Sequence, residues 1–434
     1  MLKHQQLTPN YNSLSFDPFM RNLILFENET RTNLLPFTYT RPCCEIRLGI
    51  LNIREKWEKA MNGSGSFITQ DYLTDLYDIS LSDKNYLING AVLPTPEVVN
   101  QILQLGVGEA LVNNDELIAA LLDLDQFNRL VDDDIEVFSS YDLSESQSFI
   151  KVNNLWNLFT LLDWSIRWDF DKITEGRTSE PLPKSNTLIG SPSWLFIEKG
   201  ALVEGATINT SAGPVYIGKN ATVMEGSNIR GPFALGEKGT VKMGAKIYGP
   251  TAAGPYSTLG GEIKNVLMLE HASKGHEGYI GNSVIGAWCN LGADTNCSNL
   301  KNNWTEVKIW DFEKRALLPS GQLKAGLFLG DYSMTSINSM FNTGTVVGIC
   351  CNIFGSGFPE KFIPSFTWGG TNGSQTYLID KALAAIERMK NIHKQSFTVE
   401  ERIMLLKVFE ESARYRTWEK KSDTMSYLKA ARDN

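Results

Sequence analysis

Residues 215–250, VYIGKNATVMEGSNIRGPFALGEKGTVKMGAKIYGP, repeat one pattern every six positions. An aliphatic side chain leads each repeat, at Ile217, Val223, Ile229, Leu235, Val241 and Ile247. A period of six fits neither an α-helix, whose period is about 3.6, nor a simple two-sided strand. It fits short strands joined by tight corners, with the aliphatic leader inside and a small residue four positions later, where the chain turns.

Three such strands make one triangular coil of about eighteen residues, and stacked coils bury a continuous aliphatic column. The spacing begins upstream at Ile197 and Val203, and it resumes downstream at Leu329, Thr335, Phe341, Val347 and Ile353. We therefore predict a left-handed parallel β-helix of hexapeptide repeats over residues 186–370, an exception to the usual right-handed crossover.

The sequence patterns on either side of the repeat differ from it and from each other. Residues 21–185 mix short strands, such as NLILF, with helical patterns, such as IREKWEKAM, and this alternation predicts an α/β domain. Residues 371–434 contain two amphipathic runs, the second opened by a capping box of Thr398 and Glu401, so we predict two helices. Residues 1–20 have no apolar stretch or cleavage signal and are interpreted as a tail.

Composition limits the classes of partner. The net charge of −8 argues against a general nucleic-acid or acidic-membrane binder, and no apolar run approaches the roughly 20 residues of a membrane span. The six cysteines include two adjacent pairs, at 43–44 and 350–351, and no C-x-x-C. We expect free thiols in a reducing cytoplasm.

A stretch rich in polar residues interrupts the repeat at residues 273–300, SKGHEGYIGNSVIGAWCNLGADTNCSNL. Together with EIKN just upstream, this stretch supplies six spaced candidates: Glu262, Lys264, His276, Tyr279, Asn290 and Asn299. Stacked coils bring groups that are distant in sequence to one edge. Acyl transfer to an amine needs a base whose pKa is near neutrality, which histidine provides, and a carboxylate that orients the imidazole. A lysine offers a point charge for a phosphate.

These elements resemble the acetyltransferase domain of the bifunctional N-acetylglucosamine-1-phosphate uridyltransferase/glucosamine-1-phosphate acetyltransferase family. EIKN, SKGHEGYIGN, NLGADT and CSNL stand where that family has E-V-K-K, K-x-G/N-H-L-x-Y-x-G-D, N-I-G-A-G-T and C-N-Y. The resemblance implies that His276 is the general base and that Glu262 orients it. It also implies that Lys264, Tyr279 and Asn290 hold the sugar phosphate, and that Asn299 lies near the thioester of acetyl-CoA.

Two departures and one alternative stay open. The link that follows CSNL is longer than in the family, so the acetyl-CoA pocket cannot be transferred residue by residue, and Asp331 replaces the serine of the family's F-V-G-S. Alternatively, His271 and His276 belong to a zinc site, although that chemistry needs three imidazoles or equivalents.

The opening of the first domain, NLILFENETRTNLLPFTYTRP, resembles that of sugar-phosphate nucleotidyltransferases. Its loop lacks the glycines that let backbone amides approach a triphosphate. Arg31 is retained, Arg41 stands near the usual P-K, and Asn89 begins an N-G-A where the family has the N-G-D whose carboxylate holds magnesium. Either these three residues contact UTP or the sugar phosphate, with Mg²⁺ assisting, or the domain keeps the fold without catalysis. The acidic run VDDDIEVF (131–138) is interpreted mainly as a solvated face.

The resemblance as a whole implies a two-activity enzyme that makes UDP-N-acetylglucosamine from glucosamine-1-phosphate, acetyl-CoA and UTP. It also implies a homotrimer with sites between subunits. A hexapeptide acyltransferase for another amino sugar, a nucleotidyltransferase for a different sugar, and a non-catalytic scaffold remain as alternatives.

Overall fold

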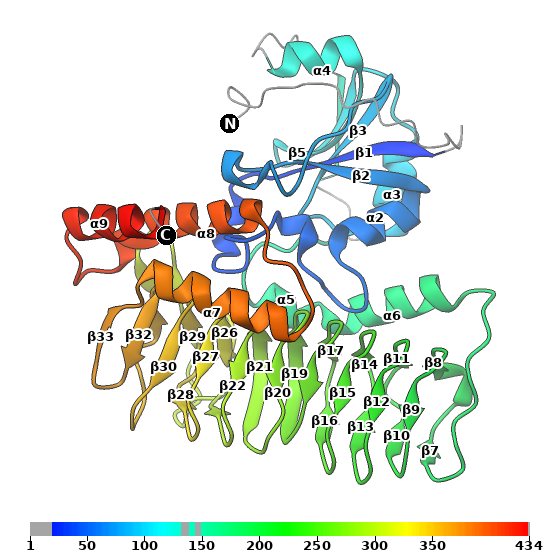
Figure 1. The fold of residues 1–434 in the computed structure, drawn as a ribbon. Helices are drawn as coiled ribbons and strands as arrows, with labels where there is room; N and C mark the ends of the chain where they lie inside the picture. The colour runs from blue at the N-terminus through cyan, green and yellow to red at the C-terminus, as the bar shows by residue number, and fades with distance from the viewer. Residues whose placement is uncertain (1–19, 132–138, 144–148, 433–434) are drawn as a thin grey trace. The chain divides into compact units, whose positions relative to one another are not determined.

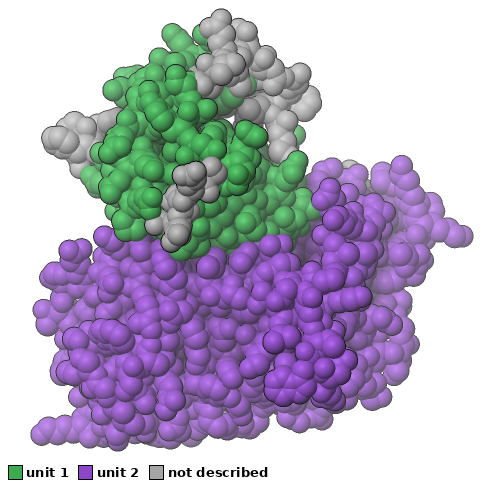
Figure 2. Space-filling view, turned by 180° about the vertical axis from the view of Figure 1, so that it is seen from behind, with its two compact units in different colours: residues 1–34, 41–46, 51–153 green, residues 35–40, 47–50, 154–434 purple. Residues whose placement is uncertain are grey.

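The computed structural model describes residues 20–131, 139–143 and 149–432, so the tail 1–19 and most of the acidic run lie outside the described residues. The chain divides into two compact units (Figure 2). The first comprises residues 1–34, 41–46 and 51–153, and the second comprises residues 35–40, 47–50 and 154–434.

The first unit is built on a six-stranded sheet with the order β2-β1-β3-β5-β4-β6. Its strands are β1 (Arg21–Phe26), β2 (Gly63–Ile68), β3 (Lys84–Asn89), β4 (Glu109–Asn113), β5 (Glu116–Asp123) and β6 (Ser139–Asp142). β1 is parallel to both of its neighbours, whereas β5 is antiparallel to β3 and β4. Leu23, Ile24 and Leu25 of β1 are fully buried, as expected of a central strand covered on both faces.

Four helices and two short 3-10 turns complete this unit. They are α1 (Thr30–Asn33), η1 (Cys43–Glu45), α2 (Ile53–Met61), η2 (Asp71–Leu73), α3 (Pro96–Leu103) and α4 (Leu124–Val131). Asn52 and Glu55 form a capping box at the start of α2, and Thr95 caps α3 with a proline as its first residue. Local sequence therefore sets where these helices begin.

Two short segments of the amino-terminal region belong to the second unit, together with α5 (Asn157–Thr160) and α6 (Leu162–Thr174). Thr40 Oγ1 donates to the buried carboxylate of Asp331 at 2.6 Å. The amide nitrogen of Ile50 donates to Asp169 Oδ2 at 2.7 Å. The L-P-F-T-Y-T run therefore packs with the coils of the second unit.

The second unit is a parallel β-helix with three strand-bearing faces (Figure 1). Its first face contains η3 (Pro192–Trp194) followed by β8 (Leu195–Ile197), β11 (Val215–Ile217), β14 (Phe233–Leu235) and β17 (Thr251–Ala253). Val215 pairs with Phe233, and Phe233 with Thr251, which gives an eighteen-residue coil as predicted. All six repeat leaders are at most 2% exposed.

The second face is a ten-stranded sheet. It consists of β9 (Leu202–Val203), β12 (Thr222–Val223), β15 (Thr240–Val241), β18 (Thr258–Leu259), β20 (Ser273–Lys274), β22 (Asn290–Leu291), β27 (Met334–Thr335), β30 (Asn352–Phe354), β32 (Thr367–Gly370) and β33 (Gly373–Thr376). The inward residues of the downstream strands, Thr335 and Ile353, are buried as the repeat spacing predicts.

The third face begins with β7 (Thr187–Ile189), β10 (Thr207–Asn209), β13 (Asn228–Arg230) and β16 (Lys246–Tyr248). It continues into β19 (Glu262–Met268) and β21 (Tyr279–Ile285), which bend at Asn265 and Asn282 and cross onto the first face. There they are followed by β26 (Leu327–Leu329), β29 (Thr345–Val347) and β31 (Phe362–Ile363). β23 (Asn296–Cys297) and β28 (Met340–Phe341) pair separately.

The long link after CSNL contains an antiparallel hairpin, β24 (Lys308–Asp311) and β25 (Ala316–Pro319). Trp310 of this hairpin stacks on Phe362, with ring centroids 4.0 Å apart. The extra residues therefore form an ordered element that packs on the downstream coils.

Three helices follow the β-helix: α7 (Ile379–Ile392), α8 (Val399–Ser412) and α9 (Lys421–Arg432). The predicted capping box of Thr398 and Glu401 is present. Both predicted helices are present, as α7 and α8. The second ends earlier than its run predicted, because α8 stops at Ser412 and a short turn η4 (Ala413–Tyr415) follows, and α9 is a third helix that was not predicted.

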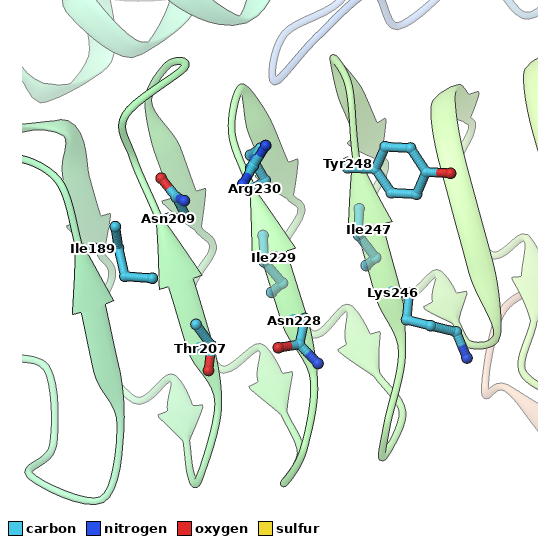
Figure 3. Close-up of a pocket in the computed structure, with 9 residues that line it drawn as sticks. All are labelled: Ile189, Thr207, Asn209, Asn228, Ile229, Arg230, Lys246, Ile247 and Tyr248. Atoms are coloured by element: carbon cyan, nitrogen blue, oxygen red, sulfur yellow. The ribbon is translucent and has the colours of Figure 1, made fainter.

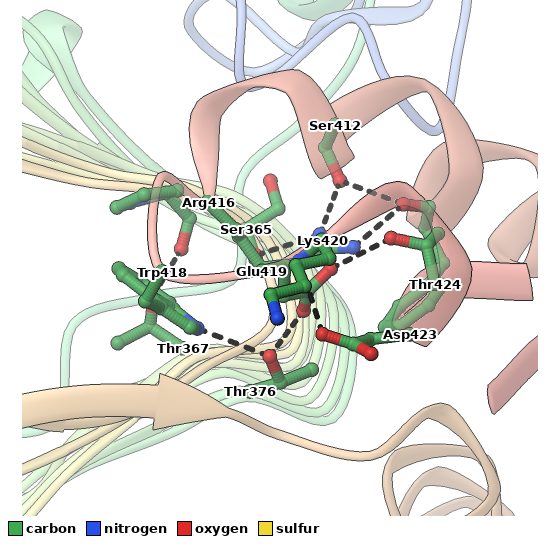
Figure 4. A network of polar contacts seen from close by, with 12 residues as sticks. Ser365, Thr367, Thr376, Ser412, Arg416, Trp418, Glu419, Lys420, Asp423 and Thr424 are labelled. Atoms are coloured by element: carbon green, nitrogen blue, oxygen red, sulfur yellow. Dashed lines mark hydrogen bonds and ion pairs between the residues drawn. The ribbon is translucent and has the colours of Figure 1, made fainter. Parts of the chain in front are cut away.

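Arg416 explains this early stop (Figure 4). Its guanidinium is buried, donates to the Phe409 carbonyl and to Ser412 Oγ at 3.0 Å each, and pairs with Glu419 at 2.7 Å. Cationic side chains at a helix C-terminus satisfy carbonyls that have no partner within the helix. The fold class is thus confirmed as an α/β sheet unit, a parallel β-helix and carboxyl-terminal helices.

Candidate functional site

The strand β19 presents two of the predicted residues on the third face. Glu262 and Lys264 flank the buried Ile263, so their side chains leave the strand on the same outer side. Glu262 is paired with Tyr279 at the start of β21. The coil stacking therefore brings these three predicted residues together.

Tyr248, on the preceding coil, completes this cluster, although it was not among the residues predicted from the sequence. Its hydroxyl donates to Glu262 Oε1 at 2.6 Å. This hydrogen bond, together with partial burial and the charge of the carboxylate, raises the pKa of Tyr248 to about 12. Lys264 Nζ lies 5.4 Å from the centre of the Tyr248 ring. Tyr248 is paired with Lys264 on the next coil, so the register of the coils is the signal that could have identified Tyr248 from the sequence.

Tyr279 begins the adjacent strand β21, where it is paired with Glu262. A Cβ built on Gly281 would be 2.3 Å from the Tyr279 hydroxyl oxygen, so a larger residue at position 281 would force that ring to shift. Burial raises the pKa of Tyr279, and the negative charge of Glu262 acts in the same direction. The phenol therefore stays protonated at neutral pH and can act as a hydrogen-bond donor.

Asn299 belongs to a ladder of corner asparagines. Its amide donates to Asn282 Oδ1 at 2.7 Å. In the orientation that gives every amide atom a partner, Asn282 in turn donates to Asn265 at 2.9 Å. Asn299 lies at the same edge as Tyr279, but its amide is already used in the hydrogen bond to Asn282 at the corner.

His276 lies in an exposed turn next to the beginning of β19. A Cβ built on Gly261 would be 2.8 Å from the His276 carbonyl oxygen, and one on Gly260 would be 3.3 Å from its nitrogen. The turn therefore meets the residue that directly precedes Glu262. In this structure Glu262 accepts from Tyr248, and no hydrogen bond joins its carboxylate to the His276 imidazole. That predicted pairing stays a prediction.

Asn290 is not brought to this cluster. It starts β22 on the second face, where it is exposed and pairs with Ser273 and Met334. Within one chain, it lies on a different face of the β-helix from Lys264.

A groove of about 320 Å³ runs along the third face towards the cluster (Figure 3). Its lining includes the exposed Arg230 and Lys246 and the half-buried Asn209 and Tyr248. Through Tyr248 the groove is continuous with Glu262. Two cations, Arg230 and Lys246, lie at this groove, whose lining also includes Ile189, Ile229 and Ile247.

Asp331 is fully buried and accepts hydrogen bonds from the Ala287 amide at 2.8 Å and from Thr40 at 2.6 Å. At this position, where the related family has a serine, the carboxylate joins two parts of the second unit.

In the first unit, polar residues gather at the carboxyl ends of the parallel strands β1 and β3. Asn89, fully buried at the end of β3, donates to Glu116 Oε1 at 3.1 Å and accepts from the Ala91 amide at 3.0 Å. Asn28 and Lys151 also donate to the same carboxylate oxygen. The carboxyl ends of parallel strands are where α/β sheets bind ligands. Sequence reasoning missed Glu116 and Lys151 because they come from distant segments.

Arg31 lies at the same edge, in α1. It donates to the Tyr72 hydroxyl, and its Nε is 3.8 Å from Glu27 Oε2. Burial raises the pKa of Glu27, and the charge of Arg31 opposes that rise. Arg41 is also buried, at 7% exposure. Both arginines are thus parts of packed clusters in this structure.

The described donor set does not fit a preformed Mg²⁺ site. Ala91 stands where the related family has a carboxylate, and Glu116 already accepts from Lys151. Among the described residues, no group of three or more histidine, cysteine, aspartate or glutamate side chains is placed to hold a metal ion. All six cysteines are free thiols, as predicted, and all are buried.

The comparisons with known proteins match parts of the chain. Residues 23–178 match the family model described as sugar nucleotidyl transferase. A 93-residue stretch is 34% identical to the bifunctional sugar-1-phosphate nucleotidylyltransferase/acetyltransferase of Sulfurisphaera tokodaii, covering 21% of this chain and 23% of that protein. A 107-residue stretch is 32% identical to the bifunctional protein GlmU of Methanocaldococcus jannaschii, covering 25% and 26%. The aligned stretches thus span only about a quarter of each relative.

Among solved structures, the polysialic-acid-specific acetyltransferase NeuO aligns at 13% identity and a TM-score of 0.27, covering 48% of this chain and 94% of that one. The UDP-N-acetylglucosamine acyltransferase from Campylobacter jejuni aligns at 15% identity and a TM-score of 0.23, covering 57% of this chain and 93% of that one.

None of the helices in the described ranges is long and apolar enough to cross a bilayer. Residues 23–178 therefore resemble sugar nucleotidyl transferases, and two stretches of the chain resemble parts of bifunctional nucleotidyltransferase/acetyltransferase relatives.

Proposed function

We propose that this chain makes UDP-N-acetylglucosamine in two steps. The third face of the β-helix would transfer an acetyl group from acetyl-CoA to the amine of glucosamine-1-phosphate. The first unit would then transfer a uridylyl group from UTP to the acetylated sugar phosphate, releasing pyrophosphate. This extends the transferase character of the matched family and relatives to defined substrates.

The observation that carries the acetyl-transfer step is the convergence of Glu262, Lys264 and Tyr279 beside the His276 turn. Lys264 would neutralise the substrate phosphate, and the Tyr279 phenol would donate to a sugar hydroxyl. His276 would take the proton of the amine as it attacks the thioester carbonyl. The C–N bond forms, the C–S bond breaks, and coenzyme A leaves as the thiol.

Uridylyl transfer rests on charge neutralisation at the end of β1 and β3. An oxygen of the sugar phosphate attacks the α-phosphorus of UTP, and the pyrophosphate leaves. Positioning and electrostatic stabilisation supply most of the catalysis in phosphoryl chemistry. Lys151, Arg31 and Arg41 are the cations that we assign to this edge, and Glu116 holds Lys151 in place. We expect Mg²⁺ to be supplied with the triphosphate and derive no step through it.

Asn290 motivates the proposed homotrimer. It faces away from Lys264 in one chain, so a neighbouring copy would have to supply it to the same site. A cytoplasmic setting is proposed from the six free thiols.

The decisive experiment measures acetyl-CoA-dependent thiol release with a panel of amino-sugar phosphates, and UTP-dependent pyrophosphate release in the presence of Mg²⁺. His276→Ala is expected to lower acetyl transfer by at least about 100-fold, the usual size of general-base catalysis, and to leave pyrophosphate release unchanged. Glu225→Gln, which changes an exposed carboxylate on an earlier coil, is the control and should keep its activity.

Other outcomes identify the alternatives. Thiol release with a different amino sugar only would mean that this sugar, and not glucosamine-1-phosphate, is the acetyl acceptor. Pyrophosphate release with a different sugar phosphate would mean that this compound is the substrate of uridylyl transfer. A chain that is folded yet silent with every donor and acceptor would be a scaffold. Full acetyl transfer by His276→Ala would show that His276 is not the general base.

A further inference from the structure

One charged side chain lies inside the apolar column of the β-helix. Lys274 occupies the inward position of β20, where its register partner on the preceding coil is Leu259, and the next leader before that is Val241. Lys274 is 1% exposed. An ammonium buried without partners costs several kcal/mol, so its contacts must compensate.

Those contacts all lead to one place. Lys274 Nζ donates to the carbonyl oxygen of Glu277 at 2.9 Å, to that of Gly260 at 3.3 Å, and to that of His276. Gly260 lies in the corner that precedes Glu262, and the other two carbonyls belong to the His276 turn. A single ammonium, with its three donors, therefore joins the turn to the corner.

Other charges surround this group. Glu277 and Asp294 stabilise the cation and Lys246 opposes it, but burial is the largest effect and lowers the pKa of Lys274 to about 8. The side chain is thus charged at neutral pH and close to the point at which it loses a proton.

We propose that Lys274 is a positioning residue, whose buried ammonium fixes the backbone of residues 276–277 against Gly260 so that the His276 imidazole is presented at the edge formed by Glu262 and Lys264. This inference rests on the proposed acetyl transfer and adds a role that the exposed site residues do not have. Lys274 does not touch substrate, because its Nζ is enclosed by the three carbonyls.

The test replaces Lys274 by an apolar side chain of similar length. Lys274→Met keeps the column filled but removes the three donors, whereas Leu259→Met changes the register partner in the same column and leaves the turn untouched. Lys274→Met is expected to fold and to lower kcat for acetyl transfer about 100-fold, because a small displacement of a catalytic group has effects of that size. KM for acetyl-CoA should stay within about threefold. Leu259→Met should behave like the wild type.

Hydrogen exchange provides a readout that does not depend on activity. The Glu262 amide donates to the Gly278 carbonyl at 3.2 Å, and the Asp294 amide donates to the Glu277 carbonyl at 3.1 Å. Both amides report on the turn, and both should lose protection in Lys274→Met only. If the wild type transfers no acetyl group, the proposed function fails, while loss of protection at these amides still supports the positioning contact. Unchanged protection overturns the inference whatever the activity.

The pH profile separates positioning by charge from simple packing. In the wild type, kcat should decline above about pH 8 as Lys274 deprotonates. In Lys274→Met, kcat should be low without that decline. A decline of the same midpoint in both proteins would contradict the role of the ammonium.

Discussion

Tyr248 donates a 2.6 Å hydrogen bond to Glu262 from the adjacent coil, so the carboxylate expected to orient His276 is itself oriented by a phenol. Because Glu262 accepts from Tyr248, its position on the third face is fixed before any substrate arrives. The same pairing raises the pKa of Tyr248 to about 12, which keeps the phenol a donor throughout the physiological range.

Removing this hydroxyl tests whether the orientation of Glu262 matters. Tyr248→Phe should lower kcat/KM for acetyl transfer by roughly tenfold to 100-fold, because a hydrogen bond to a charged group contributes roughly 1.5–3 kcal/mol. Tyr216→Phe is the matched control, since Tyr216 donates to Glu198 at 2.8 Å on another face. Equal losses in both variants would mean that the effect comes from general destabilisation, which urea unfolding of each variant would reveal.

Glu116 tests the edge of the first unit. Glu116→Gln removes the charge that holds Lys151, and it should lower UTP-dependent pyrophosphate release by about tenfold or more without changing acetyl transfer. Glu109→Gln, on the neighbouring strand β4, alters an exposed pair with Tyr141 and should have no effect on either reaction. A Glu116→Gln enzyme with full pyrophosphate release would show that this cluster only supports the fold.

His271 predicts how stability depends on pH. Its ring stacks on Trp288, with centroids 3.8 Å apart, and on Tyr256. Burial lowers its pKa to about 4, the positive charges of His393 and Lys390 act in the same direction, and Glu270 opposes them. The unfolded chain, with an ordinary histidine pKa, binds the proton first, so stability present above about pH 6.5 should be lost as pH falls towards 4.

The measurement is urea unfolding at pH 7 and at pH 5. His271→Asn keeps a residue that tolerates the positive φ at this corner but has no imidazole to protonate. The wild type should lose up to about 2 kcal/mol more than this variant between the two pH values. Parallel losses in both proteins would assign the acid sensitivity to other groups.

The repeat over residues 215–250 determined the β-helix, because a six-residue period has one compact solution, in which each leader enters a shared column. The same reasoning placed Glu262, Lys264 and Tyr279 on one face. Within the α/β unit, strand β1 and the helical run IREKWEKAM of α2 also followed from local pattern.

Only the tertiary structure decided which side chains meet across coils and strands. Tyr248, Glu116 and Lys151 gave no local signal, since each acquires its partner from a segment brought near by stacking or sheet pairing. Lys274 shows the limit most clearly. By its place in the repeat it should be an aliphatic residue, and the carbonyls that the fold turns inward make a buried ammonium stable there. A periodic sequence fixes which way a side chain points, whereas its partner depends on how coils of unequal length stack.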